Sequence, residues 1–262
     1  MQHTPAGLVR KLRNAPRLWL FLDYDGTLAD FAPTPDHVEP RSDVVHLVSR
    51  LAQQPDLRVT IVSGRRLRHV EDLVPVPGII LAGTYGIELR LPDGEHVDRV
   101  TYQQVRPTLD TIKPHWSDLL AGHEGFYLED KGWALAIHAR FAASDTEADR
   151  VLAAASQIAG QVADEDLFRR LGGHRFLEIG PRQAHKGLTI DYLWKQYAWP
   201  DALPVYIGDD DKDEEAFGVV QARGGIAIVV GGAERKTVAD HRLEAPADTR
   251  RWLGALLELR AG

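Results

Sequence analysis

The sequence has 262 residues, 44% of them hydrophobic, and its 31 basic (lysine and arginine) against 38 acidic residues give a formal net charge of −7. This balance predicts a globular protein of one large domain or two modest ones, and it argues against a nucleic-acid partner, because phosphate contacts need clustered lysine and arginine. The chain has no cysteine, which excludes disulfides, cysteine-ligated metals and thiol nucleophiles.

The first part of the chain alternates short apolar runs with amphipathic segments. The apolar runs predict strands at Leu18–Leu22, Arg58–Val62 and Gly78–Ala82. Helical periodicity predicts helices at Ser42–Gln53 and Ser63–Leu73. This order of strands and helices indicates a doubly wound parallel sheet.

The pattern changes after the third strand. Residues Ile87–Leu91 and the turn Pro92-Asp93-Gly94 predict a hairpin. The next segment is expected to be α+β, with antiparallel strands joined by short turns or by one helix. Its expected helices are Thr108–Leu120 and Asp145–Val162, and its expected strands lie near Phe126–Arg140, Leu167–Leu171 and Arg175–Ile179.

The last part of the chain returns to the first pattern. The expected elements are helices at His185–Gln196 and Glu214–Val220 and strands at Val205–Gly208 and Ile226–Val230. We therefore predict an α/β fold, with a doubly wound, Rossmann-like parallel-sheet core formed by residues 1–105 and 181–262. An α+β domain is inserted at residues 106–180.

Two acidic clusters follow predicted strands. Asp23 and Asp25 lie in the segment DYDGT directly after Leu18–Leu22, and Asp209 begins the segment DDDKD after Val205–Gly208. Open parallel sheets bind ligands at the carboxyl ends of their strands. If the two strands are neighbours, the carboxylates form a site suited to Mg²⁺, which prefers oxygen ligands. The alternative interpretation is two solvated acidic turns.

Two further residues are candidates for binding an anion. Ser63 ends a predicted strand, and its hydroxyl and the backbone N–H groups of the following helix start suit a phosphate. The alternative is an ordinary N-cap serine. Lys186 begins a helix and supplies a charge opposite to that of a phosphate, the alternative being a surface lysine.

The order of these motifs resembles the haloacid dehalogenase superfamily of phosphatases. DYDGT, VSGR, a lysine that precedes a helix and GDDDKDEEAF are similar to its four motifs. Within the superfamily, LAGTYGIELR, LEDKGWALAIHAR, FLEIGP followed by HKG, and IGDDDKDEEAF resemble the trehalose-6-phosphate phosphatases. The resemblance spans about Phe21 to Phe217, and it implies a haloacid-dehalogenase-like core with the inserted domain as a cap.

The resemblance implies a covalent mechanism. Asp23 would attack phosphorus and form an aspartyl-phosphate. Asp25 would protonate the leaving sugar oxygen and then activate water. Ser63 and Lys186 would hold the transferring phosphoryl oxygens.

The resemblance also implies a metal site. Mg²⁺ would be bound by Asp23, the backbone carbonyl of Asp25 and Asp209. Asp213 would orient Lys186 or a metal-bound water, and Asp210 would contact such a water or serve only as a turn residue.

Substrate recognition is expected from the inserted domain. By resemblance, Glu129, Lys131 and Glu178 would bind sugar hydroxyls through charge-assisted hydrogen bonds. The alternative is a surface ion pair without functional meaning. Arg65 and Arg140 are weaker candidates for phosphate or sugar binding.

Some positions depart from the family pattern. Tyr85 stands in GTYG where the family usually has histidine, and Ala139 stands in HAR where it usually has tyrosine. Tyr85 keeps a hydroxyl donor but cannot carry a positive charge, so the preferred sugar stays open.

We therefore expect a Mg²⁺-dependent phosphatase that acts on a small-molecule sugar phosphate. Trehalose 6-phosphate is the expected substrate. The alternatives are sucrose 6-phosphate, a glycosyl-phosphoglycerate or another small sugar phosphate, and a non-catalytic sugar-phosphate-binding protein. A dinucleotide-binding oxidoreductase is set aside because no Gly-x-Gly-x-x-Gly turn follows the first strand.

No apolar run reaches the roughly 20 residues of a membrane span, and no signal-peptide core follows the basic N-terminal residues, so we expect a cytoplasmic protein without a membrane partner. The oligomeric state stays open, and a monomer is compatible with the sequence.

Overall fold

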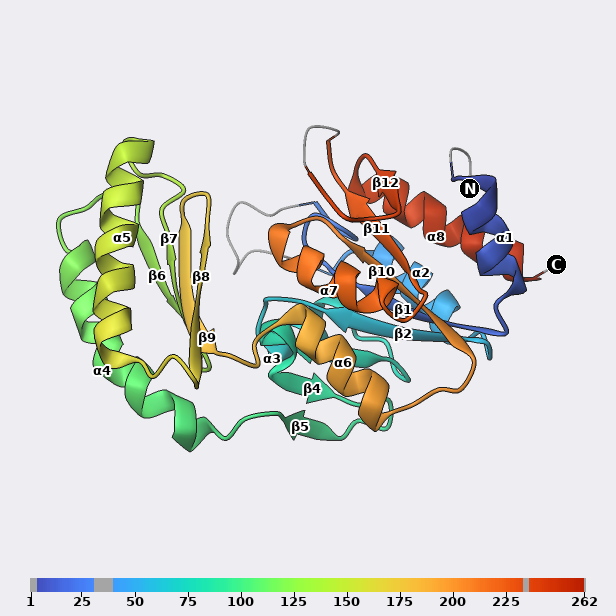
Figure 1. Cartoon of the computed structure of the whole chain (residues 1–262), viewed down its shortest axis with the longest axis horizontal. Coiled ribbons are helices and arrows are strands. Elements are labelled where there is room, and N and C mark those ends of the chain that lie inside the picture. Colours follow the sequence, from blue (N-terminus) through green and yellow to red (C-terminus); the bar gives the residue numbers. More distant parts are fainter. Residues whose placement is uncertain (1–3, 31–39, 233–235, 262) are drawn as a thin grey trace. The chain divides into compact units, whose positions relative to one another are not determined.

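The computed structural model describes residues 4–30, 40–232 and 236–261 (Figure 1). The chain divides into two compact units. The first, here called the core unit, comprises residues 1–97 and 185–262, and the second, the inserted unit, comprises residues 98–184. The observed division lies eight residues before the expected start of the inserted domain at residue 106, and four residues after its expected end at residue 180.

The core unit is built on a parallel sheet. Its described strands lie in the order β12-β11-β10-β1-β2-β3-β4-β5, parallel from β12 to β3, with β4 antiparallel to β3. The bounds are β1 Arg17–Leu22, β2 Leu57–Val62, β3 Ile80–Gly83, β4 Glu88–Arg90, β5 His96–Asp98, β10 Ala202–Gly208, β11 Ile226–Val230 and β12 His241–Leu243.

Helices cover both faces of this sheet (Figure 1). They are α1 Ala6–Asn14, α2 Ser42–Ala52, α3 Leu67–Leu73, α6 Lys186–Gln196, α7 Asp211–Gln221 and α8 Pro246–Ala261, and a short 3-10 turn, η1, spans Thr84–Gly86. Strand β1 shows why helices are needed on both faces of the sheet. Leu18, Leu20 and Leu22 pack into one apolar cluster with α1, α2 and α8, whereas Trp19 and Phe21 pack into another with α6 and α7. Side chains of a strand alternate between faces, so an uninterrupted apolar run is buried on both.

The inserted unit is a four-stranded antiparallel sheet with two helices. The strand order is β6-β7-β9-β8, with β6 Tyr127–Asp130, β7 Leu135–His138, β8 Phe168–Gly173 and β9 Phe176–Pro181. Helices α4 Tyr102–Leu120 and α5 Asp145–Val162 pack together on one face of this sheet (Figure 1).

Some predicted elements were wrong in detail. The single strand expected at Phe126–Arg140 is a hairpin of β6 and β7, whose turn contains Gly132 at a φ of +80°, a conformation that favours glycine. Helix α4 begins at Tyr102 and not at Thr108, because Thr101 and Gln104 form a capping box at its start. Helices α1 and α8 and strand β12 were not predicted. Among the described helices, none is both long and apolar enough to cross a membrane.

Candidate active site

The two acidic clusters lie side by side because strands β1 and β10 are neighbours. Leu22 is in register with Ile207, and the backbone N–H of Asp23 donates to the carbonyl of Ile207 at 3.0 Å. Asp23 and Asp209 therefore leave the sheet at the same edge. The sequence-based expectation that their strands are adjacent is confirmed.

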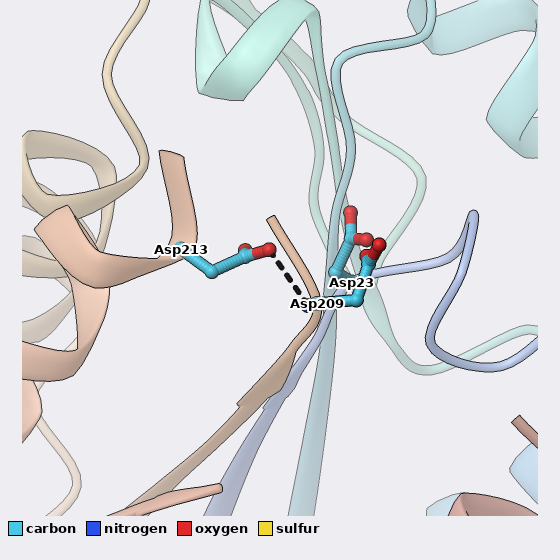
Figure 2. A group of neighbouring side chains, drawn as sticks. All are labelled: Asp23, Asp209 and Asp213. Carbon is cyan, nitrogen blue, oxygen red and sulfur yellow. Dashed lines mark hydrogen bonds between the residues drawn. The ribbon is translucent and has the colours of Figure 1, made fainter. Parts of the chain in front are cut away.

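Asp23 and Asp209 present their carboxylates toward the same space (Figure 2). With Asp213 they form a group in which each residue offers one oxygen and all three oxygens lie within 4.8 Å of one another. The Thr27 hydroxyl lies 3.3 Å from Asp23 Oδ2 and 3.2 Å from Asp209 Oδ1 and joins the pair. Sequence reasoning missed Thr27, although it ends the DYDGT motif.

The oxygens of Asp213 are already engaged by the protein. Its Oδ1 accepts hydrogen bonds from Lys186 Nζ and from the Tyr206 hydroxyl, both at 2.6 Å. Its Oδ2 accepts the backbone N–H groups of Asp209 at 3.0 Å and Asp210 at 2.9 Å, the first of which is drawn in Figure 2. Asp213 therefore fixes the turn after β10, whereas the carboxylates of Asp23 and Asp209 share the Thr27 hydroxyl. Tyr206 was not predicted, because a tyrosine in an apolar strand also suits plain core packing.

Lys186 is a buried cation between two carboxylates. Its ammonium group lies 3.0 Å from Asp23 Oδ1 and 2.6 Å from Asp213 Oδ1, and only 3% of its side chain is exposed. Burial acts to lower the pKa of Lys186, but attraction to Asp213 and Asp23 raises it well above its usual range. Lys186 is therefore charged, and the surface-lysine alternative is wrong.

One lysine does not balance the negative charge of this cluster. Burial raises the pKa of Asp23 well above its usual range despite Lys186, and the charges of Asp213 and Asp209 add to the rise. Burial, together with Asp213, raises the pKa of Asp209 to about 6. Burial acts in the same direction on Asp210, but Lys186 and Lys212 hold its pKa below its usual value. The group as a whole favours binding of another positive charge.

Asp25 is paired with Arg65. The Arg65 Nε donates to Asp25 Oδ2 at 2.6 Å and its Nη2 donates to Oδ1 at 2.8 Å. Ser63, nearby in the chain, is buried, and its hydroxyl oxygen accepts the backbone N–H of Arg65 at 3.1 Å. The expectation that a helix begins at Ser63 is wrong, since α3 begins at Leu67. A phosphate at Ser63 would meet a loop and not a helix N-terminus.

Tyr85 lies in a tight turn after β3. Thr84 and Tyr85 have φ values of 47° and 54°, and the Tyr85 carbonyl accepts the Thr189 hydroxyl of α6 at 2.6 Å. The Tyr85 ring packs over Gly64, where a Cβ atom would come within 2.7 Å of it. Tyr85 is therefore held between the Ser63 loop and α6.

The other predicted substrate residues belong to the inserted unit. Lys131 Nζ donates to Glu178 Oε2 at 2.6 Å, and this pair is buried, with side-chain exposures of 8% and 1%. Glu129 Oε2 lies 2.8 Å from His138 Nε2. Arg140 is exposed, with its guanidinium 5.9 Å from the centre of the Phe141 ring. The alternative interpretation of these residues, a surface ion pair, is wrong for Lys131 and Glu178 because both side chains are buried.

Comparison with known proteins gives the family. The family model for trehalose-phosphatase matches residues 21–247. The chain belongs to the trehalose-phosphatase family. This member is 36% identical over 249 residues to the trehalose-phosphate phosphatase of Mycobacterium marinum, and the match covers 92% of the chain. It covers 62% of the relative, so the chain spans about three fifths of that protein's length.

Solved structures of this and related families share its fold. The C-terminal domain of Candida albicans trehalose-6-phosphate phosphatase matches with a TM-score of 0.83 at 21% identity, over 96% of both chains. A haloacid dehalogenase-like hydrolase from Bacteroides thetaiotaomicron matches with a TM-score of 0.64 at 14% identity, over 92% of this chain and 99% of that one. The predicted haloacid-dehalogenase-like α/β fold is confirmed.

Proposed function

We propose that this chain is a phosphatase that hydrolyses trehalose 6-phosphate to trehalose and phosphate. The observation that carries the proposal is the contact of Lys186 with Asp23 beside Asp209, at the edge of the sheet where the β1 and β10 ends meet. Membership of the trehalose-phosphatase family and the name of the Mycobacterium marinum relative support the substrate.

Asp23 is the proposed nucleophile. Its carboxylate oxygen attacks phosphorus, the bond from phosphorus to the sugar oxygen breaks, and an aspartyl-phosphate forms. Water then attacks this phosphorus, the aspartate oxygen leaves and inorganic phosphate is released. Contact with Lys186 supports the role, because the ammonium favours the ionised carboxylate and can also bind a phosphoryl oxygen.

Asp25 is the proposed acid and base. It gives its proton to the departing sugar oxygen and takes a proton from the attacking water in the second step. Its bidentate pair with Arg65 supports a positioning role for Arg65, which holds the Asp25 carboxylate in one orientation. The Ser63 hydroxyl, with Lys186, is the proposed donor to the transferring phosphoryl oxygens.

The donor set fits Mg²⁺. Asp23 and Asp209 offer carboxylate oxygens on adjacent strand ends, and their raised pKa values reflect a cluster that is short of positive charge. The cation would be held by these two carboxylates and by the backbone carbonyl of Asp25, with Asp213 and Asp210 shaping the loop around it. When bound, Mg²⁺ neutralises charge on the phosphate ester and keeps the Asp23 and Asp209 carboxylates ionised.

Sugar recognition is assigned to the inserted unit as a cap. Glu129, Lys131 and Glu178 are the proposed partners of the sugar hydroxyls, and Arg140 is a further candidate. The buried Lys131–Glu178 pair supports this, because Glu178 Oε1 is buried and accepts no hydrogen bond from the described residues. A sugar hydroxyl would satisfy that oxygen. The predicted cytoplasmic location stays a prediction.

Phosphate release tests class, metal and substrate together. The purified chain should release phosphate from trehalose 6-phosphate with Mg²⁺ and lose this activity with a chelator. The panel should also contain sucrose 6-phosphate, a glycosyl-phosphoglycerate and glucose 6-phosphate, because Tyr85 and Ala139 depart from the family pattern. A preference of roughly a hundredfold for another phosphate would overturn the substrate, since such a ratio exceeds what one small contact supplies. No release from any member, with tight binding of one, would favour the non-catalytic binding protein.

A further inference from the structure

The helix that carries Lys186 holds a second buried polar residue close to the candidate active site. Thr189 lies in the first turn of α6, three residues after Lys186, and is buried. Residues three apart on a helix lie on the same side of it. The Thr189 hydroxyl donates to the backbone carbonyl of Tyr85 at 2.6 Å. The first turn of α6 therefore contacts Asp23 through Lys186 and the turn after β3 through Thr189.

Tyr85 in turn contacts the loop that contains Ser63. The backbone N–H of Tyr85 donates to the carbonyl of Ser63 at 2.8 Å. The Tyr85 ring packs over Gly64, the residue that follows Ser63, where a Cβ atom would lie 2.7 Å from ring atom Cε1. Two hydrogen bonds through the backbone of one residue thus connect Thr189 with Ser63.

The turn that carries this connection has a strained backbone. Thr84 and Tyr85 have φ values of 47° and 54°, and a positive φ is unusual for residues other than glycine, above all for a β-branched one. Such a conformation persists only where the surrounding structure holds it. The Thr189 hydroxyl is one of the groups that hold it. Glycine at position 86 permits this approach, because a Cβ atom there would overlap the Thr189 hydroxyl.

A simpler interpretation is that Thr189 only satisfies a buried carbonyl, as most buried polar groups require. Two observations favour a role in the site. The residue that accepts from Thr189 is the one whose N–H and ring contact the Ser63 loop. Thr189 also shares a helical turn with Lys186, which is the other proposed donor to the phosphoryl oxygens.

We propose that Thr189 is a positioning residue, which sets the place of the Ser63 hydroxyl relative to the Lys186 ammonium. These two donors must reach different oxygens of one phosphoryl group, so their separation has to be fixed before the substrate arrives. The first turn of α6 carries one donor and holds the other through Tyr85. This inference rests on the proposed function and deepens it, because it names the residue that lets the two donors act together.

The test removes only the hydroxyl of Thr189 and uses Mg²⁺ with the sugar phosphate that the parent hydrolyses fastest. Thr189→Val keeps the shape of the side chain and should lower kcat about tenfold with less than about a twofold change in KM, because a misplaced donor is lost mainly in the transition state. Thr189→Ser keeps the hydroxyl, so its kcat should stay within about threefold of the parent's.

Thr249→Val is the matched control. Thr249 is a buried threonine of α8, and its hydroxyl has no hydrogen-bond partner among the described residues. The same change of side chain at this position should leave kcat unaltered. Denaturant unfolding of all three variants shows that the proteins compared are folded.

A double-mutant comparison separates positioning from a general structural defect. In a Ser63→Ala background, Thr189→Val should lower kcat by no more than about twofold, because the hydroxyl that it positions is already absent. A loss of active protein would instead multiply the two effects. A tenfold loss in both backgrounds, an unchanged kcat in Thr189→Val or no rescue by Thr189→Ser would therefore overturn the inference. A Ser63→Ala variant as active as the parent would also overturn it, while phosphate release by the parent would still support the proposed function.

The inference can also be tested if the parent releases no phosphate from any substrate. The proposed function then fails, and calorimetric binding of inorganic phosphate in the presence of Mg²⁺ decides the role of Thr189. Weaker binding by Thr189→Val than by the parent and Thr189→Ser supports positioning of the two donors. Equal binding by all three proteins, or no binding by the parent, overturns it.

Discussion

Asp25 and Arg65 form a bidentate ion pair, with both carboxylate oxygens accepting hydrogen bonds from the guanidinium at 2.6 and 2.8 Å. Forty residues separate them in the chain, yet Asp25 follows β1 and Arg65 follows the adjacent β2. The pair fixes the direction of the proposed acid, and one of these oxygens must leave the guanidinium before it can exchange a proton with a substrate or with water.

The leaving group should decide how much Asp25 matters. Asp25→Asn should lower kcat for a sugar phosphate by about 10²–10⁴, the usual contribution of a general acid and base. An aryl phosphate has a leaving group that needs no protonation. The Asp25→Asn variant should therefore still form the aspartyl-phosphate from this substrate. Rapid-mixing measurements should then show a burst of phenolate equal to the enzyme present, followed by slow turnover. A variant with no burst and equal losses on both substrates would contradict the acid role.

The nucleophile can be tested against a neighbour of the same type. Asp23→Asn should abolish turnover and leave sugar-phosphate binding largely in place, because the amide keeps the shape of the side chain but cannot form the aspartyl-phosphate. Asp211→Asn is the control, since Asp211 is exposed in the acidic segment after β10 and has no proposed role. Phosphate release and calorimetric binding measure the two effects. Turnover by Asp23→Asn at the parent's rate would rule out the covalent route.

Metal-free protein should lose stability as the pH rises. The pKa of Asp209 is about 6 in the folded state, raised from 3.8 by burial and by Asp213, and that of Asp23 is raised as well. The folded state therefore holds protons that the unfolded chain releases at lower pH, so stability is greatest at acid pH and falls as the pH passes 6. In a chelator, the thermal midpoint should drop by several degrees between about pH 5 and 7.5.

Mg²⁺ should reverse this loss. At roughly 100 times its Kd it should add about 2.7 kcal/mol near pH 7.5, and less at pH 5, where protons compete for the carboxylates. Asp209→Asn should flatten the pH slope and remove the Mg²⁺ effect. The same slope in Asp209→Asn, or Mg²⁺ stabilisation that is independent of pH, would show that the cation binds elsewhere.

Gly208 should tolerate no side chain. A Cβ atom there would lie 2.2 Å from Asp213 Cγ, so Gly208→Ala must displace the carboxylate that holds Lys186 and the turn after β10. We expect the free energy of unfolding to fall by about 1–3 kcal/mol. Most of the phosphatase activity should be lost as well. Gly218→Ala is the control, because a Cβ atom on this glycine of α7 would point into open space and alanine favours a helix. Equal stability of the two variants in denaturant unfolding would refute the steric argument.

The sequence by itself determined the position of the candidate active site in the fold. An apolar strand that ends in DYDGT and another that ends in GDDDKD must bring their carboxylates to one sheet edge once the strands are parallel neighbours, because side chains at carboxyl ends share that edge. The doubly wound order of strands and helices could also be predicted from the sequence. Strands that are buried on both faces are apolar throughout, as Leu18–Leu22 is.

The tertiary structure alone decided which of these carboxylates is engaged by several donors of the protein itself. Asp213 looks like Asp209 in the sequence, but the Tyr206 hydroxyl, Lys186 and two backbone N–H groups occupy its oxygens. The pairing of Asp25 with Arg65, and the orphaned oxygen of Glu178, likewise depend on strands that meet only after folding. Hydrogen-bond partners are set by distance and direction in space, and no local pattern in the chain encodes them.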